Sequence, residues 1–219
     1  MRILGIDPSL TNLGFVILEG GSTGFPQILE KGRLQSETKD GLPLQRYVMQ
    51  AHGIADLVKK YDIQYVASEA PYYGDFNTEI LYGLHTMLHF TYWNLKLNVV
   101  ILAPLTVKSY ALPGFKEKIF KSDMIKAARQ DLGMRENERL ANDVADAYWI
   151  SKLGLRFWLY YCKLLSDTDL TDKEKDVFTH SHTFTRGSKK GVTERKGIIY
   201  RKNELFYIYS ELPEQNFLK

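Results

Sequence analysis

The fold is decided at the start of the chain, in the sequence RILGIDPSLTNLGFVIL of residues 2–18. Two apolar runs, at 2–6 and 14–18, flank a turn-rich segment at 7–12. Glycines at positions 20, 21 and 24 then mark a second turn, and a third strand is predicted at 27–34. Three successive strands at hairpin spacing predict an antiparallel meander.

Beyond residue 44 the apolar spacing alternates between helical and strand patterns. The predicted helices span residues 44–60, 77–95, 122–132 and 143–165, and the predicted strands span 63–68 and 99–102. Asn77 and Asn142 stand where helix caps are expected. A meander followed by crossover-linked strands is typical of an α/β fold, so we expect a mixed five-stranded sheet flanked by helices.

Length and composition exclude several classes of protein. A chain of 219 residues suits one ordinary domain and something extra, and 44% hydrophobic with 25% charged residues is typical of a soluble globular protein. No stretch approaches the roughly 20 apolar residues of a membrane helix, so no membrane partner is expected. The single cysteine, Cys162, excludes an intrachain disulfide and favours a reducing, cytoplasmic location.

The small net charge of +3 is unevenly distributed. Residues 177–219 carry eight Lys and Arg against four Glu, a surplus of +4, whereas the first 176 residues are near neutral at −1. The polar segment 167–176 is interpreted as a linker between a first domain at 1–166 and a basic extension at 177–219. Abundant Thr, Tyr, Phe and Ile predict two or three short strands in that extension.

The extension is expected to face a polyanion. A predicted hairpin tip at 185–191 and the residues after it concentrate positive charge, and phosphate contact is the functional interpretation. The predicted contacts are Arg186, Lys189, Lys190, Arg195 and Lys196. A solvated basic tail is the alternative. His180 and His182 share a strand face, but no nearby Cys or acid completes a metal site.

Four acids stand where chemistry explains them better than packing does. Asp7 and Glu69 each end an apolar strand, and Asp143 and Asp146 share one face of a helix. Such a carboxylate pair is repulsive unless a cation lies beside it, and hard oxygen ligands suit Mg²⁺ or Mn²⁺. The helix dipole offers a metal-free alternative, because both helical acids lie in the first turn.

The motif GIDPSLTNLGF at 5–15 resembles the opening motif of RuvC-type Holliday junction resolvases. Glu69, the DVADA motif at 143–147, and the segments APLTVK at 103–108 and KSD at 121–123 resemble that family's remaining acids and basic segment in order and spacing. The similarity covers residues 1–152, about two-thirds of the chain. It implies a ribonuclease-H-like fold and a homodimer that cuts four-way DNA junctions at two symmetry-related sites by metal-assisted phosphodiester hydrolysis.

The expected roles follow from that chemistry and from the resemblance. Phosphodiester hydrolysis needs an activated water and a stabilised leaving oxygen, which two Mg²⁺ ions can supply and for which Mn²⁺ is expected to substitute. The four acids are the expected catalytic ligands, with Asp7 bridging the ions. The resemblance places Lys121 at the scissile phosphate and Lys108 at a second backbone contact. Tyr72 and Tyr73 fall where the family has an aromatic wedge that can stack on a base, and Tyr72 matches better.

Other functions stay open at this point. A ribonuclease H or a broader branched-DNA nuclease of the same fold would share the acids, and a non-catalytic DNA-binding module would leave acids beside a polyanion unexplained. An ATPase of the actin and sugar-kinase class needs a duplicated body, for which 219 residues leave no room, so no nucleotide cofactor is expected. The length beyond the final core helix departs from typical family members and suggests a phage or viral source.

Overall fold

The protein is described by a computed structural model that covers residues 1–71, 78–114, 119–135, 137–179, 181–183, 193–195 and 205–207. Its centre is a mixed sheet in the order β3-β2-β1-β4-β5-β8. The strands are β1 (Arg2–Asp7), β2 (Asn12–Glu19), β3 (Gln27–Gln35), β4 (Tyr65–Glu69), β5 (Asn98–Leu102) and β8 (Leu205–Tyr207). The first three strands are antiparallel neighbours, and β1, β4 and β5 run parallel. The predicted meander and five-stranded sheet are confirmed, and β8 adds a strand antiparallel to β5.

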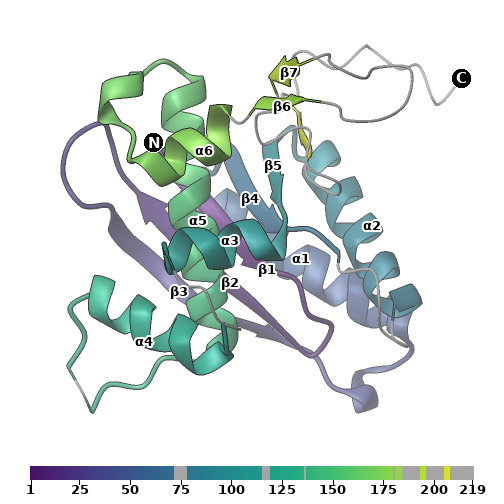
Figure 1. Ribbon diagram of the computed structural model, residues 1–219. Coiled ribbons are helices and arrows are strands. Elements are labelled where there is room, and N and C mark those ends of the chain that lie inside the picture. The colour runs from purple at the N-terminus through teal and green to yellow at the C-terminus, as the bar shows by residue number, and fades with distance from the viewer. Residues whose placement is uncertain are drawn as a thin grey trace, which may run out of the picture.

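Both faces of the sheet are covered by helices, which explains the long apolar runs of its central strands (Figure 1). α5 (Asn142–Tyr161) packs on one face, and α1 (Pro43–Tyr61) and α2 (Thr78–Asn94) pack on the other. A Cβ added at Gly5 of β1 would lie 2.4 Å from the Ser151 Cβ of α5. Glycine at this position therefore allows α5 to lie directly on the central strand.

The remaining helical segments are short. They are the 3₁₀ turns η1 (Thr38–Asp40) and η2 (Asp167–Asp169) and the helices α3 (Pro104–Ala111), α4 (Lys121–Asp131) and α6 (Asp172–Thr179). The helices predicted at 44–60, 77–95 and 122–132 are confirmed to within one residue. α3 was missed because Pro104 looks like a strand stop. Proline suits the first position of a helix, where its missing N–H leaves no hydrogen bond unmade.

α5 differs from its prediction at both ends. Asn142 is its first helical residue and Ala141 is the cap, so the predicted Asn142 cap is wrong. The helix ends at Tyr161, before the predicted residue 165, because Lys163 adopts a left-handed φ of 59°. The Leu164 N–H then donates to the Leu159 carbonyl at 2.9 Å, which is a common way for a helix to close.

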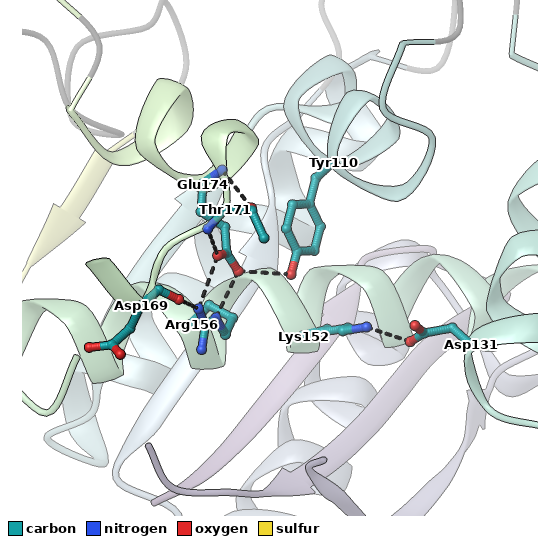
Figure 2. A network of polar contacts seen from close by, with 7 residues as sticks. All are labelled: Tyr110, Asp131, Lys152, Arg156, Asp169, Thr171 and Glu174. Atoms are coloured by element: carbon teal, nitrogen blue, oxygen red, sulfur yellow. Dashed lines mark hydrogen bonds and ion pairs between the residues drawn. The ribbon is translucent and has the colours of Figure 1, made fainter. Parts of the chain in front are cut away.

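The predicted linker at 167–176 is wrong, because this segment forms η2 and α6 and packs against the body of the protein. Glu174 of α6 is buried, and the Arg156 Nε of α5 donates to it at 2.7 Å (Figure 2). Tyr110 of α3 donates to the same carboxylate at 3.3 Å. The sequence did not predict this helix because its polar part has no apolar stripe. That part is held instead by the ion pair between Glu174 and Arg156.

The extension contains the short strands that were predicted. β6 (Ser181–Thr183) and β7 (Thr193–Arg195) form an antiparallel pair, and β8 joins the central sheet. The division into domains at 1–166 and 177–219 stays a prediction. None of the helices in the described part of the chain is long and apolar enough to cross a membrane.

Candidate active site

Asp7 and Glu69 lie at the same edge of the sheet. β1 and β4 are parallel and pair Ile6 with Ser68, so the residue that follows in each strand is an acid. The two acidic side chains interact electrostatically, because the Glu69 charge raises the pKa of Asp7. The pairing of β1 with β4 thus brings the two predicted strand-end acids together.

The first turn of α5 brings Asp143 and Asp146 to this edge. β2 pairs Gly14 with Asp7, and the backbone of Asp143 occupies the space beside Gly14. A Cβ added at Gly14 would lie 2.1 Å from the Asp143 carbonyl oxygen. Because backbone atoms cannot move aside as a flexible side chain does, any other residue at 14 would push the start of α5 away from Asp7. The glycine of the opening motif therefore sets the distance between the strand acids and the helix acids.

Burial and like charges raise the pKa of three of these acids. The pKa of Asp7 is well above its ordinary 3.8, first because of lost solvation and then because of the neighbouring acids. Lost solvation and the Asp146 charge raise the pKa of Glu69 to about 7. Lost solvation also raises the pKa of Asp146, and Asp143 adds to the effect. A cluster that disfavours its own ionisation to this degree is stabilised by a cation.

Two lysines lie within electrostatic reach of the acids. Lys121 is the first residue of α4, and Lys108 lies in the last turn of α3. Their charges lower the pKa of Glu69 and of Asp146 against the larger effect of desolvation. The structure therefore brings all five predicted catalytic residues and Lys108 to one place.

Arg33 of β3 is a further charged residue at this site that the sequence did not reveal. Its Nη1 lies 3.8 Å from Oδ2 of Asp143. β2 pairs Gly14 with Arg33 on one side and with Asp7 on the other, so these three positions form a row across adjacent strands. Arg33 is brought next to the opening motif by the register in which β2 and β3 pair. The lengths of the predicted turns do not determine this register, so the sequence did not predict the position of Arg33.

The predicted aromatic wedge and most of the predicted basic contacts lie outside the described residues. These are Tyr72, Tyr73, Arg186, Lys189, Lys190 and Lys196, together with His180 and the hairpin tip at 185–191. Arg195 belongs to β7, opposite Ser181 of β6. Their contacts with DNA stay predictions.

The chemistry of the donors fits a hard divalent ion. All four acids offer carboxylate oxygens, which Mg²⁺ and Mn²⁺ prefer. In the described ranges, no group of three or more His, Cys, Asp or Glu side chains is already arranged to hold a metal ion. A divalent ion bound among these carboxylates would favour their deprotonated forms.

Known proteins are similar in sequence to about 70% of this chain. The crossover junction endodeoxyribonuclease RuvC of Parasynechococcus marenigrum (strain WH8102) is 29% identical over 157 residues, which are 70% of this chain and 97% of that protein. RuvC of Synechococcus sp. (strain CC9902) is 27% identical over 157 residues, with the same coverage. No protein-family model matches the chain.

Solved structures share the fold. Thermus thermophilus RuvC in complex with a Holliday junction substrate gives a TM-score of 0.60 at 20% identity, over 74% of this chain and 94% of that one. The yeast mitochondrial Holliday junction resolvase Ydc2 gives a TM-score of 0.51 at 14% identity, over 74% and 85% of the two chains. The sequence likeness and the shared fold agree with each other, so the chain is similar to RuvC in sequence and has the same ribonuclease-H-like fold.

Proposed function

We propose that this protein is an endonuclease that resolves four-way DNA junctions by metal-dependent phosphodiester hydrolysis. The observation that carries the proposal is the meeting of four carboxylates and two lysines at one edge of a RuvC-type sheet. Acids that destabilise one another next to a polyanion make sense only if divalent cations offset their charge. The exposed free thiol of Cys162 suits a reducing compartment, which we take to be the cytoplasm.

The residues of the chain divide the work between ion binding and phosphate binding. Asp7, Glu69, Asp143 and Asp146 would hold the ions, two Mg²⁺ or Mn²⁺ in our proposal. When bound, these ions would supply an activated water and stabilise the leaving oxygen. Lys121 would hold the scissile phosphate, and Lys108 would hold the backbone beside it.

Junction resolution needs two cuts, so we propose that two copies of the chain act together. Each copy would supply one acid cluster, and a symmetric homodimer would place the clusters on two strands of equal polarity. In this arrangement Tyr72 or Tyr73 would stack on a base near the junction centre. The basic residues of the extension, Arg186, Lys189, Lys190, Arg195 and Lys196, would contact the arms.

The test is a cleavage panel with labelled DNA. Four-way junctions, flaps, plain duplex and RNA–DNA hybrid are incubated with Mg²⁺, with Mn²⁺ and with EDTA. We expect paired symmetric nicks in the four-way junction, in either metal, and none in EDTA. Cleavage of flaps or hybrids at equal rates would instead favour a broader nuclease of the same fold.

Two substitutions show whether the acid cluster is responsible. Asp146→Asn removes one ligand charge, and Asp56→Asn is the matched control because Asp56 is an exposed residue of α1. Loss of cutting in the first variant alone is the expected result. Binding to the junction without any metal-dependent cutting by the wild type would indicate a non-catalytic DNA-binding module.

A further inference from the structure

Arg33 is the one charged residue described at the candidate active site for which the proposed function has no use. We propose that Arg33 holds Asp143 while the protein is free of DNA, and transfers to a DNA phosphate when the substrate binds. Arg33 would thereby couple the binding of divalent ions to the binding of DNA. This inference rests on the proposed function and adds a positioning residue to it.

The position of Arg33 follows from the register of the meander. Residues paired across neighbouring strands point to the same face of a sheet, so position 33 shares the face of Asp7 and Gly14. Two strand spacings separate Arg33 from Asp7, which is about 10 Å between backbones. Gly14 has no side chain to occupy the space between Arg33 and Asp7, and the start of α5 lies in this space instead. A long arginine side chain at this position can therefore reach the rim of the acid cluster.

The contact between Arg33 and Asp143 is easily exchanged. At 3.8 Å the Nη1–Oδ2 distance is longer than that of a hydrogen bond. The side chains are 40% and 24% exposed, and ion pairs of this kind contribute little to stability. By contrast, Glu69 and Asp146 respond to the charges of Lys121 and Lys108 from other elements. Arg33 thus contacts Asp143, the acid in the first turn of α5.

Arg33 and a divalent ion compete for Asp143. An ion held by this carboxylate would carry twice the charge of the guanidinium and would lie close to it, so the two cations would repel each other. A phosphate removes the conflict, because the guanidinium fork pairs well with phosphate oxygens. Once Arg33 pairs with DNA, Asp143 is free to bind the ion. By linkage, DNA then strengthens ion binding and ions strengthen DNA binding by the same factor.

The experiment compares Arg33→Gln with Arg33→Lys. Ion binding is measured by calorimetric titration of Mn²⁺ into the DNA-free protein, and junction binding by fluorescence anisotropy in Ca²⁺ over a range of salt concentrations. We expect Arg33→Gln to bind Mn²⁺ about 5-fold more tightly, which is the low end of coupling between sites. The same variant should bind the junction more weakly, with a salt slope smaller by about 1 because one phosphate contact is lost. Arg33→Lys should keep most of both properties.

Arg2→Gln is the matched control, because Arg2 also forms a partly exposed pair, with Glu19 at 2.8 Å, at the opposite end of β1. It should change neither ion affinity nor salt slope. Unchanged or weaker Mn²⁺ binding in Arg33→Gln would overturn the competition, and an unchanged salt slope would overturn the phosphate contact. The Mn²⁺ titration uses no DNA, so it decides the competition even if the wild type fails to cut junctions and the proposed function fails.

Discussion

Two glutamates lie near α5, and their pKa values are shifted in opposite directions. Both have an ordinary pKa of 4.5, yet that of Glu69 is raised to about 7 and that of Glu174 is lowered. Burial alone would raise both. The difference is that the Glu174 carboxylate accepts hydrogen bonds from an arginine and one backbone N–H, whereas Glu69 lies near other acids.

The contacts of Glu174 explain its lowered pKa. Arg156 donates from two nitrogens, at 2.7 and 3.0 Å, and the Thr171 N–H donates at 2.9 Å. These hydrogen bonds outweigh the effect of burial. For Glu69 the charges of Lys108 and Lys121 do not outweigh burial and the charge of Asp146. A fully paired buried acid stabilises the fold, whereas a buried acid whose pKa is raised by other acids is available to an ion from outside.

Asp7→Asn, a substitution in the acid cluster around Glu69, should have the largest effect on activity. We expect junction cleavage to fall by at least about 10³-fold, since a metal site contributes several kcal/mol to the transition state. Junction binding should change little, because phosphate contacts dominate affinity. Cleavage and anisotropy are measured on the same preparations, with Asp56→Asn as the control. Mg²⁺-dependent cutting at the wild-type rate would remove Asp7 from the site.

The same variant tests whether the acids destabilise the fold. In EDTA at pH 8, neutralising Asp7 removes a buried like charge, so the unfolding midpoint should rise. A fall in the midpoint would mean that Asp7 is a structural acid like Glu174.

Glu174→Ala should have the opposite effect on stability. The substitution leaves the Arg156 charge without its carboxylate, which typically costs about 3–5 kcal/mol for a buried pair. The Arg156 side chain is still 24% exposed, so we expect about 3 kcal/mol. Urea unfolding measures the change, and Arg156→Met in the same chain should restore part of the loss. A change below about 0.5 kcal/mol, the size of an ordinary surface substitution, would show that α6 is held by Val177 and Phe178 alone.

The fold could be predicted where apolar periodicity is strong and fails where polar contacts decide. The meander, β4, β5 and three helices follow from apolar spacing. α6 does not, because the Glu174–Arg156 pair joins residues that lie far apart in sequence. The end of α5 depends on the left-handed backbone of Lys163, a conformation for which the residue type gives no signal.

The candidate site shows the same division. Asp7, Glu69, Asp143 and Asp146 could be named from strand ends and helix spacing, and the motif supplied the lysines. Arg33 could not, because its link to the site runs through two strand registers. The tight contact at Gly14 depends on how α5 packs on β2, which no local pattern specifies.

The pH dependence of stability separates the two glutamates. For Glu69 the folded protein binds more protons than the unfolded chain between pH 4.5 and about 7, so stability without metal should fall as the pH rises through this window. For Glu174 the unfolded chain binds more protons, so its contribution should be lost only as the pH falls below 4.5. Thermal unfolding in EDTA from pH 3 to 8 measures both, and Glu69→Gln should reduce the slope of the upper window alone, since Asp7 and Asp146 still contribute there. Mg²⁺ should raise the midpoint more at pH 8 than at pH 6, because ions bind the deprotonated acids.

Lys152→Met should have the smallest effect on stability. It tests an ion pair whose burial is less complete than that of Glu174. Lys152 of α5 donates to Asp131 of α4 at 2.5 Å (Figure 2). Tyr148 donates to the same carboxylate. The pair is about one-fifth exposed, at 19% and 26%, and Tyr148 remains as a partner after the substitution. We therefore expect a loss of about 1 kcal/mol in urea unfolding and little change in cleavage. Because α4 begins at Lys121, a loss of cleavage much greater than the loss of stability would show that this pair also positions Lys121, the lysine that we propose to bind the scissile phosphate.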